Sequence, residues 1–168
     1  MAVRKQHKKY SRPRKLFEKT RIKEENLLLN KYGLKNKKEV WRAEFYIARI
    51  RRQAKKLIMA SQSRQEEFIA RLAKIGLIKP NSKIDDVLAL TKENILERRL
   101  QTLVLRKGLS KTAKESRQFI VHRHVLMDGR IVTIPSQIIL LNEEDSIKLK
   151  ERKKKEIPKK FGEIHSSL

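Results

Sequence analysis

Residues 98–130 read RRLQTLVLRKGLSKTAKESRQFIVHRHVLMDGR, and this segment carries the most informative pattern in the chain. Apolar side chains in its first part recur at helical spacing and predict a helix that ends at Gly108. Thr112 and Glu115 then form a capping-box pattern, which places the start of a second helix at Ala113. The segment therefore predicts an elbow of two short basic helices.

A β-hairpin is expected directly after the elbow. Asp128-Gly129 is a residue pair that tolerates positive φ at both central positions of a type I′ turn. The apolar residues on each side, 125–127 and 130–132, are expected to pair as short antiparallel strands. Two later apolar segments are expected to add strands to this hairpin: residues 138–141 and 147–149.

The basic side chains of the elbow are expected to point away from its packed face. The apolar stripe of each helix occupies one side, so the other side is free to meet phosphate groups. Cations near the end of the first helix also complement the carbonyl end of the helix dipole. The cations concerned are Arg98, Arg99, Arg106, Lys107, Lys114, Arg117 and Arg123.

The overall charge indicates a polyanionic partner. The 168 residues include 43 Lys and Arg against 19 Asp and Glu, a formal net charge of +24. Nucleic acid is the counterpart that best offsets such self-repulsion. We expect no membrane partner, because no apolar run approaches about 18 residues and the start, MAVRKQHKKY, is no secretory signal. Cysteine is absent, which excludes disulfides and thiolate catalysis.

The cations are unevenly distributed along the chain. Residues 1–60 contain 20 basic and 5 acidic side chains, residues 61–90 contain 5 and 4, and residues 91–130 contain 10 and 4. Two basic regions therefore flank a nearly neutral joint. We expect an α+β fold in four parts: a basic extension (1–20), a mainly helical domain (21–90), a module of a two-helix elbow and a small antiparallel β-sheet (91–150), and a basic tail (151–168).

The N-terminal extension has many cations and few side chains to bury. Such a segment is expected to become ordered on a polyanionic partner. The alternative is a tail that only improves solubility. The candidate RNA contacts in this segment are Arg4, Lys8, Lys9, Arg12 and Arg14.

Residues 40–57 show the pattern of a packed helix with one basic face. Apolar residues from Val40 to Leu57 recur at alternating steps of three and four. No carboxylate interrupts the cations on the opposite side, which favours RNA contact over simple solvation. Trp41 adjoins the apolar side, so core packing is favoured over stacking on a base. The cationic stripe consists of Arg42, Arg49, Arg52 and Lys56.

Other local signals predict where further helices begin and end. Ser63 and Glu66 form a second capping-box pattern and predict a helix start. A short helix is expected around residues 85–90, and Thr91 is expected to cap the helix that contains Arg98. A left-handed glycine followed by leucine is typical of a Schellman end, which is expected at Gly33, Gly76 and Gly108.

The sequence does not predict an enzyme. It contains no phosphate-binding glycine loop, nucleophile elbow or zinc-protease pattern. His122 and His124 lack a ligand-spaced carboxylate or cysteine, so we interpret them as polar donors beside Arg123, not as metal ligands. We expect no cofactor, no metal and no small-molecule substrate. An RNA-modifying enzyme with this module would need a further catalytic domain of about 150 residues.

The elbow and the hairpin resemble the S-four RNA-binding domain. The blocks NKYGLKNKKEVWR (30–42) and ERRLQT (97–102) are similar to the ribosomal S-four family of the archaeal and eukaryotic type, and the resemblance runs from about Lys8 to Leu149. The general domain pattern has Asp where this chain has Gln101, a usual exchange in the archaeal and eukaryotic branch. It often has Gly where this chain has Arg123.

This resemblance implies a structural protein of the small ribosomal subunit, located in cytoplasmic ribosomes. The family binds ribosomal RNA early, nucleates folding of the five-prime domain, lies beside other subunit proteins and near the place where messenger RNA enters, and contributes to translational accuracy. The alternative is a ribosome-biogenesis factor that binds precursor RNA. The RNA-facing positions that the resemblance implies are Arg98, Arg99, Lys111, Lys114, Arg117, His122, Arg123 and His124.

Overall fold

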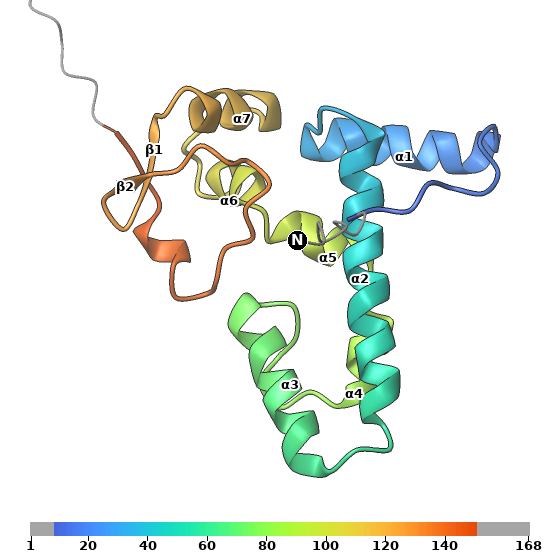
Figure 1. Ribbon diagram of the computed structural model, residues 1–168. Helices are drawn as coiled ribbons and strands as arrows, with labels where there is room; N and C mark the ends of the chain where they lie inside the picture. Colours follow the sequence, from blue (N-terminus) through green and yellow to red (C-terminus); the bar gives the residue numbers. More distant parts are fainter. Residues whose placement is uncertain (1–8, 151–168) are drawn as a thin grey trace, which may run out of the picture.

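Among the described residues, five helices form the first half of the protein, which ends at Glu97. The computed structural model describes residues 9–150, and the long helix α2 runs the length of this half, crossed by α1 near one end (Figure 1). Helices α3 and α4 lie along the other end of α2, and α5 packs against its middle. The helices are α1 (Lys19–Tyr32), α2 (Lys37–Leu57), α3 (Gln62–Ile75), α4 (Ile84–Ala89) and α5 (Lys92–Glu97).

The apolar periodicity of α2 correctly predicted the core of this half. Val40 and Ala54 are fully buried, and Ile47 and Ile50 are nearly so. The predicted short helix near residue 85 is α4. The capping box at Ser63 and Glu66 was wrong, because α3 already begins at Gln62 with Ser61 at the N-cap position.

The second half contains the predicted elbow and sheet. Helices α6 (Leu100–Arg106) and α7 (Ala113–Val121) form the elbow, and α7 begins at the predicted residue. Up to residue 150, where the described chain ends, three short strands follow in the order β2-β1-β3, with antiparallel pairing throughout. The fold is therefore α+β, as predicted. The strands are β1 (Val125–Met127), β2 (Arg130–Ile131) and β3 (Lys148–Leu149), with a short 3-10 turn at Glu144–Ser146.

The hairpin turn was also predicted correctly. Asp128 and Gly129 both have positive φ, 49° and 76°, and Met127 pairs with Arg130 across the turn. The prediction for residues 138–141 was wrong: in the described chain this segment makes one isolated bridge, from Ile138 to Arg99, and no strand.

The helix expected from Thr91 to Gly108 is broken at Arg98 and Arg99. At the break, backbone groups that would bond within a continuous helix form hydrogen bonds with residues 135–139 instead. The amide of Leu100 donates to the Gln137 carbonyl at 2.8 Å, and the Ile139 amide donates to the Arg98 carbonyl at 3.1 Å. A loop from later in the chain thus divides one predicted helix into α5 and α6.

Helix ends repeat one backbone motif. At Gly33, Gly76 and Gly108 the φ angle is positive, and the next residue's amide donates to the carbonyl five residues earlier, so these predicted Schellman ends are confirmed. A fourth such end closes α7, where Arg123 has φ 63° and the His124 amide donates to the Phe119 carbonyl at 2.9 Å. Arg123 therefore occupies a backbone position that favours glycine.

Two hydrophobic cores meet at the break in the helix. The first core includes Ile95 and Leu96 of α5, and the second begins at Leu100. Along the chain, the division between the two cores falls at residues 98–99. Within residues 9–150, no helix combines the length and apolar character that a membrane crossing requires.

Candidate nucleic-acid interface

Helix α2 presents the predicted stripe of cations to solvent. Arg42, Arg49, Arg52 and Lys56 are all exposed. Within residues 9–150, none of the four forms an ion pair; the salt bridges of this region involve other cations. The positive charge of this stripe is therefore available to an external polyanion.

The surface cations of the elbow are of two kinds. Lys111 and Lys114 are exposed, and in the described region they have no carboxylate partner. Arg106 lies 3.5 Å from Glu97, and Lys107 lies 3.5 Å from Asp145. Arg106 is exposed and Lys107 is half-buried beside the exposed Asp145. Surface pairs of this kind stabilise a protein by about 0–1 kcal/mol, so phosphate can displace the carboxylates at small cost.

Arg98 and Arg99 do not face solvent, which corrects the sequence-based expectation. Their exposed fractions are only 7% and 5%. Arg98 donates from Nη1 to Glu144 Oε2 at 2.8 Å and from Nη2 to the Ile139 carbonyl at 3.0 Å. Because the helix breaks here, both side chains turn into the junction between the two halves and act as structural ion-pair partners.

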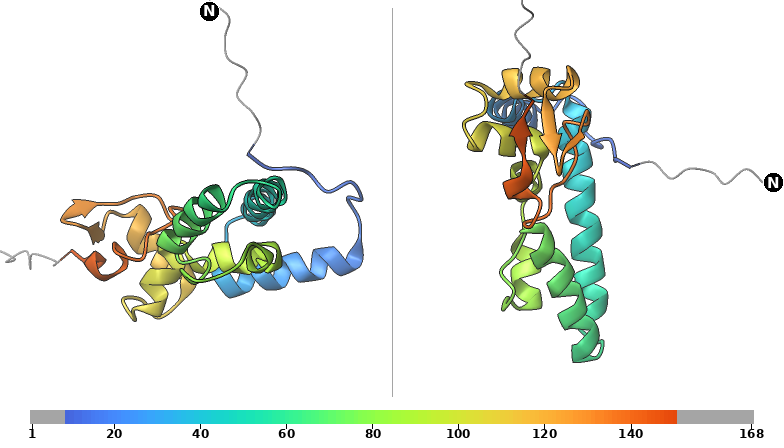
Figure 2. Two further views of the ribbon diagram at one scale, coloured as in Figure 1. Left: turned by 90° about the horizontal axis from the view of Figure 1, so that it is seen from below. Right: turned by 90° about the vertical axis from the view of Figure 1, so that its left-hand side faces the viewer.

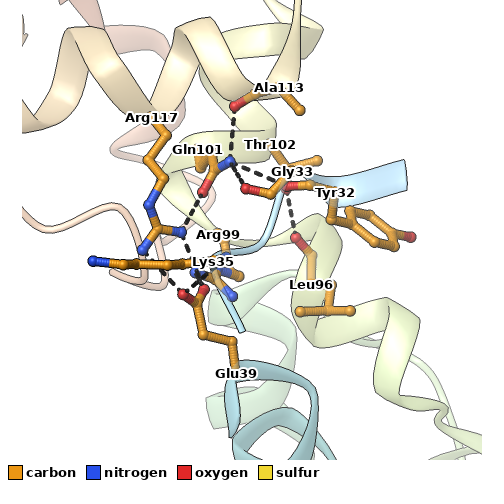
Figure 3. A network of polar contacts seen from close by, with 10 residues as sticks. All are labelled: Tyr32, Gly33, Lys35, Glu39, Leu96, Arg99, Gln101, Thr102, Ala113 and Arg117. Atoms are coloured by element: carbon orange, nitrogen blue, oxygen red, sulfur yellow. Dashed lines mark hydrogen bonds and ion pairs between the residues drawn. The ribbon is translucent and has the colours of Figure 1, made fainter. Parts of the chain in front are cut away.

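Glu39 joins the two halves of the protein (Figure 3). This carboxylate at the start of α2 accepts a hydrogen bond from Arg99 Nη2 and a bidentate pair from Arg117, at 3.0 and 3.3 Å. Burial raises the pKa of Glu39, but the hydrogen bonds from Arg117 and Arg99 outweigh burial and leave the pKa below its usual value. Glu39 is therefore ionised at neutral pH and holds α7 against α2. Arg117 is half-buried in this contact, so only part of its guanidinium is open to RNA.

Gln101 provides a second connection at the same place. Its Nε2 lies within hydrogen-bond distance of three carbonyl oxygens: Tyr32 at 3.1 Å, Gly33 at 2.9 Å and Ala113 at 2.8 Å (Figure 3). Its Oε1 accepts from Arg117 at 3.4 Å. Gln101 thus links the end of α1 to the start of α7.

Sequence reasoning missed Glu39 and Gln101. A polar residue at a buried helix position, next to Leu100, was the available signal for Gln101. A single acid within the basic block around Val40 was the signal for Glu39. Together these contacts connect the ends of α1 and α2 to the elbow.

The corner after α7 displays His122, Arg123 and His124. His122 and Arg123 are exposed, His124 is half-buried, and the two imidazole centroids lie 6.5 Å apart. Among residues 9–150, no group of three His, Cys, Asp or Glu residues is arranged to hold a metal ion. The corner is suited to hydrogen bonding with an anionic backbone.

Arg123→Gly is expected to stabilise the protein by about 0.5–1 kcal/mol. The left-handed conformation costs an L-residue about 1–2 kcal/mol, and the greater freedom of glycine in the unfolded chain offsets part of this gain. The same change is expected to weaken RNA binding, since it removes an exposed cation. Thermal unfolding and filter binding measure the two effects, and a lower melting temperature would contradict the strain argument.

The N-terminal segment contributes further cations. Lys9, Arg12 and Arg14 are exposed, whereas Arg4 and Lys8 lie outside the described residues, as does the basic tail at 151–168. Trp41 donates from Nε1 to Glu25 Oε1 at 2.9 Å and stacks on Tyr10 with a centroid distance of 6.3 Å. The indole therefore has partners within the protein, which supports the packing interpretation over base stacking.

The helical elbow, the three-stranded sheet and the exposed cations define an S4-type nucleic-acid-binding module. The S4 domain family model matches residues 98–145. This range agrees with the core boundary at Arg98.

Close relatives extend the similarity beyond the module. Small ribosomal subunit protein uS4 of Methanothermobacter thermautotrophicus is 47% identical over 148 residues, 86% of each chain. The protein of the same name from Thermoplasma acidophilum is 47% identical over 86% of this chain and 76% of the relative, and that from Methanoregula boonei is 43% identical over 85% and 82%. The chain therefore belongs to the uS4 family of small ribosomal subunit proteins. It is a structural protein and not an enzyme, as predicted.

Proposed function

We propose that this protein binds small-subunit ribosomal RNA directly through one continuous surface. The observation that carries the proposal is the junction between two sets of cations that form no ion pair within residues 9–150. Arg42, Arg49 and Arg52 of α2 lie on one side of this junction, and Lys111 and Lys114 of the elbow lie on the other. Phosphate contacts are expected to supply most of the affinity, and RNA shape most of the specificity.

The rigid junction also supports a role early in assembly. A protein whose two basic faces are already oriented loses little conformational entropy when it holds RNA segments together. In line with the family resemblance, we propose that the protein nucleates folding of the five-prime domain of the RNA. Its proposed place is in the small subunit of cytoplasmic ribosomes, beside other ribosomal proteins and near the site where messenger RNA enters, where it contributes to translational accuracy. Exposed apolar side chains such as Phe17 and Met59 are suited to protein neighbours.

The proposed interface comprises exposed cations, cations with weak partners, and the polar corner after α7. Arg98 and Arg99 are left out of it because they are buried. Arg4 and Lys8 remain proposals from the sequence alone. The other proposed contacts are Lys9, Arg12, Arg14, Arg42, Arg49, Arg52, Lys56, Arg106, Lys107, Lys111, Lys114, Arg117, His122, Arg123 and His124.

The double variant Lys111→Gln/Lys114→Gln is expected to lower affinity for small-subunit ribosomal RNA about 10-fold. It should also reduce the slope of log affinity against log salt by about 2, since each phosphate contact contributes about one unit. Filter binding over a series of salt concentrations measures both quantities. Lys79→Gln/Lys83→Gln is the matched control, because these two lysines are exposed in the loop between α3 and α4, distant from the elbow. Equal slopes for the two variants would contradict the elbow interface.

A ribosome-biogenesis factor is the second candidate function, because an assembly factor would need the same RNA-binding surface. Copy number in sucrose-gradient fractions after a moderate salt wash distinguishes the two. One copy per mature small subunit is expected for a structural component. Presence on precursor particles alone would support the assembly factor instead.

A further inference from the structure

A cleft of about 450 Å³ lies where α2 meets the S4 module. Arg42 and Tyr46 of α2 form one side, and Arg99 and Arg117 lie on the side of the module. The loop residues Ser136 and Ile138 complete the wall. The volume falls within the range of about 300–1,000 Å³ that is typical of small-ligand sites.

The cleft contains a buried guanidinium with few partners. Arg99 has an exposed fraction of only 5%, and within the described residues its side chain donates one hydrogen bond, from Nη2 to Glu39. Its Nε–H has no partner within the described part of the chain. A guanidinium has five N–H donors, and buried donors without acceptors are uncommon in folded proteins. Arg99 therefore brings to the cleft wall a guanidinium whose hydrogen-bonding capacity is only partly used within the described chain.

The charge at the cleft favours an anion. Lys9, Arg42, Arg99 and Arg117 all line it, and the only lining acid in the described structure is Glu39. Glu39 is already engaged by two guanidinium groups, as Figure 3 shows. A net positive site remains, which attracts phosphate oxygens.

The other part of the cleft is apolar and aromatic. The half-buried Tyr46 lies in the wall with Ile138, and both also pack against the core of the helical half. An aromatic ring beside arginine groups is the combination on which proteins stack unpaired bases.

We propose that this cleft binds one unstacked nucleotide of the ribosomal RNA, with its base against Tyr46 and its phosphate near Arg42 and Arg99. The proposal rests on the RNA-binding function proposed above and adds a specific pocket to it. Arg42 of the α2 stripe and Arg117 of the elbow both line the cleft, so an RNA strand that contacts both helices would pass across it.

Tyr46→Ala in the full-length protein tests the stacking contact. With transcribed small-subunit ribosomal RNA as the probe, affinity is expected to fall about 5- to 100-fold while the salt slope stays unchanged, because no charge is removed. Tyr46→Phe, which keeps the ring, should bind like the unmodified protein. Chemical probing is expected to show one nucleotide that the unmodified protein protects and Tyr46→Ala leaves reactive.

Ser136→Leu provides a second test that leaves the core intact. Ser136 is exposed and lines the cleft, so a larger side chain fills the pocket without removing a packed group. The same nucleotide is expected to become reactive, whereas Ser63→Leu on the exposed face of α3 should change nothing. Unchanged affinity and probing with both cleft variants, while the unmodified protein binds RNA, would overturn the pocket. Failure of the unmodified protein to bind RNA would instead overturn the proposed function.

Discussion

Replacing both Arg98 and Arg99 with glutamate is expected to unfold the junction between the two halves of the protein. Each guanidinium is buried and paired with a carboxylate, Glu144 and Glu39 respectively. Loss of one partner of a buried ion pair costs about 3–5 kcal/mol, and reversal adds repulsion between the facing carboxylates. The combined cost is comparable to the free energy of unfolding of a typical domain, which is about 5–15 kcal/mol.

Thermal unfolding followed by circular dichroism measures this effect. The matched control is Lys111→Glu/Lys114→Glu, which changes the net charge equally at two exposed positions. The control is expected to retain its melting temperature within a few degrees and to lose RNA affinity. If the Arg98/Arg99 variant melted like the unmodified protein, the structural role of these arginines would be wrong, and an RNA-facing role would be restored.

Gly33→Ala is expected to destabilise the protein by about 3 kcal/mol. Gly33 has φ 59°, and a Cβ there would lie 2.8 Å from the Ala113 Cβ and 2.9 Å from the Ala113 carbonyl carbon. Neither of these atoms belongs to a flexible side chain, so α7 would have to move away from the end of α1. The left-handed backbone adds about 1–2 kcal/mol.

Gly108→Ala separates the two contributions. Gly108 has a similar φ of 70°, but its Cβ would meet nothing within 4 Å. Denaturant unfolding is expected to show a loss of only about 1 kcal/mol for this variant, the part due to backbone conformation. Equal losses at the two glycines would mean that the contact with Ala113 imposes no cost.

The distinction between exposed and buried arginines changes how the charge of this protein is interpreted. The α2 stripe and the elbow lysines remain open to RNA, whereas Arg98, Arg99 and part of Arg117 hold the two surfaces in place. A basic side chain in this fold therefore has one of two roles, and sequence position alone did not distinguish them. Arg98 and Arg99 illustrate this. Like the α2 cations they lie beside an apolar stripe in the sequence, yet they are buried whereas the α2 cations are exposed.

Much of the local structure could be predicted from the sequence, because local interactions determine it. The start of α7 at Ala113, the turn at Asp128-Gly129 and the glycine ends of α1, α3 and α6 each depend on residues within a few positions of one another. The cationic stripe of α2 follows from helical periodicity. In each case the interaction that decides the structure lies within one helical turn or one hairpin, so a short window of sequence contains it.

The tertiary structure decided the break at residues 98–99, the burial of both arginines and the junction at Glu39 and Gln101. Arg99 meets Glu39 across 60 positions, Arg98 meets Glu144 across 46, and Gln101 reaches the Gly33 carbonyl across 68. Arginine is amphipathic, and its environment depends on which distant carboxylate or loop packs against it. The sequence alone therefore determined the helical periodicity, the turn and the positive charge, and only the packing of distant segments determined which cations support the surface and which remain available to RNA.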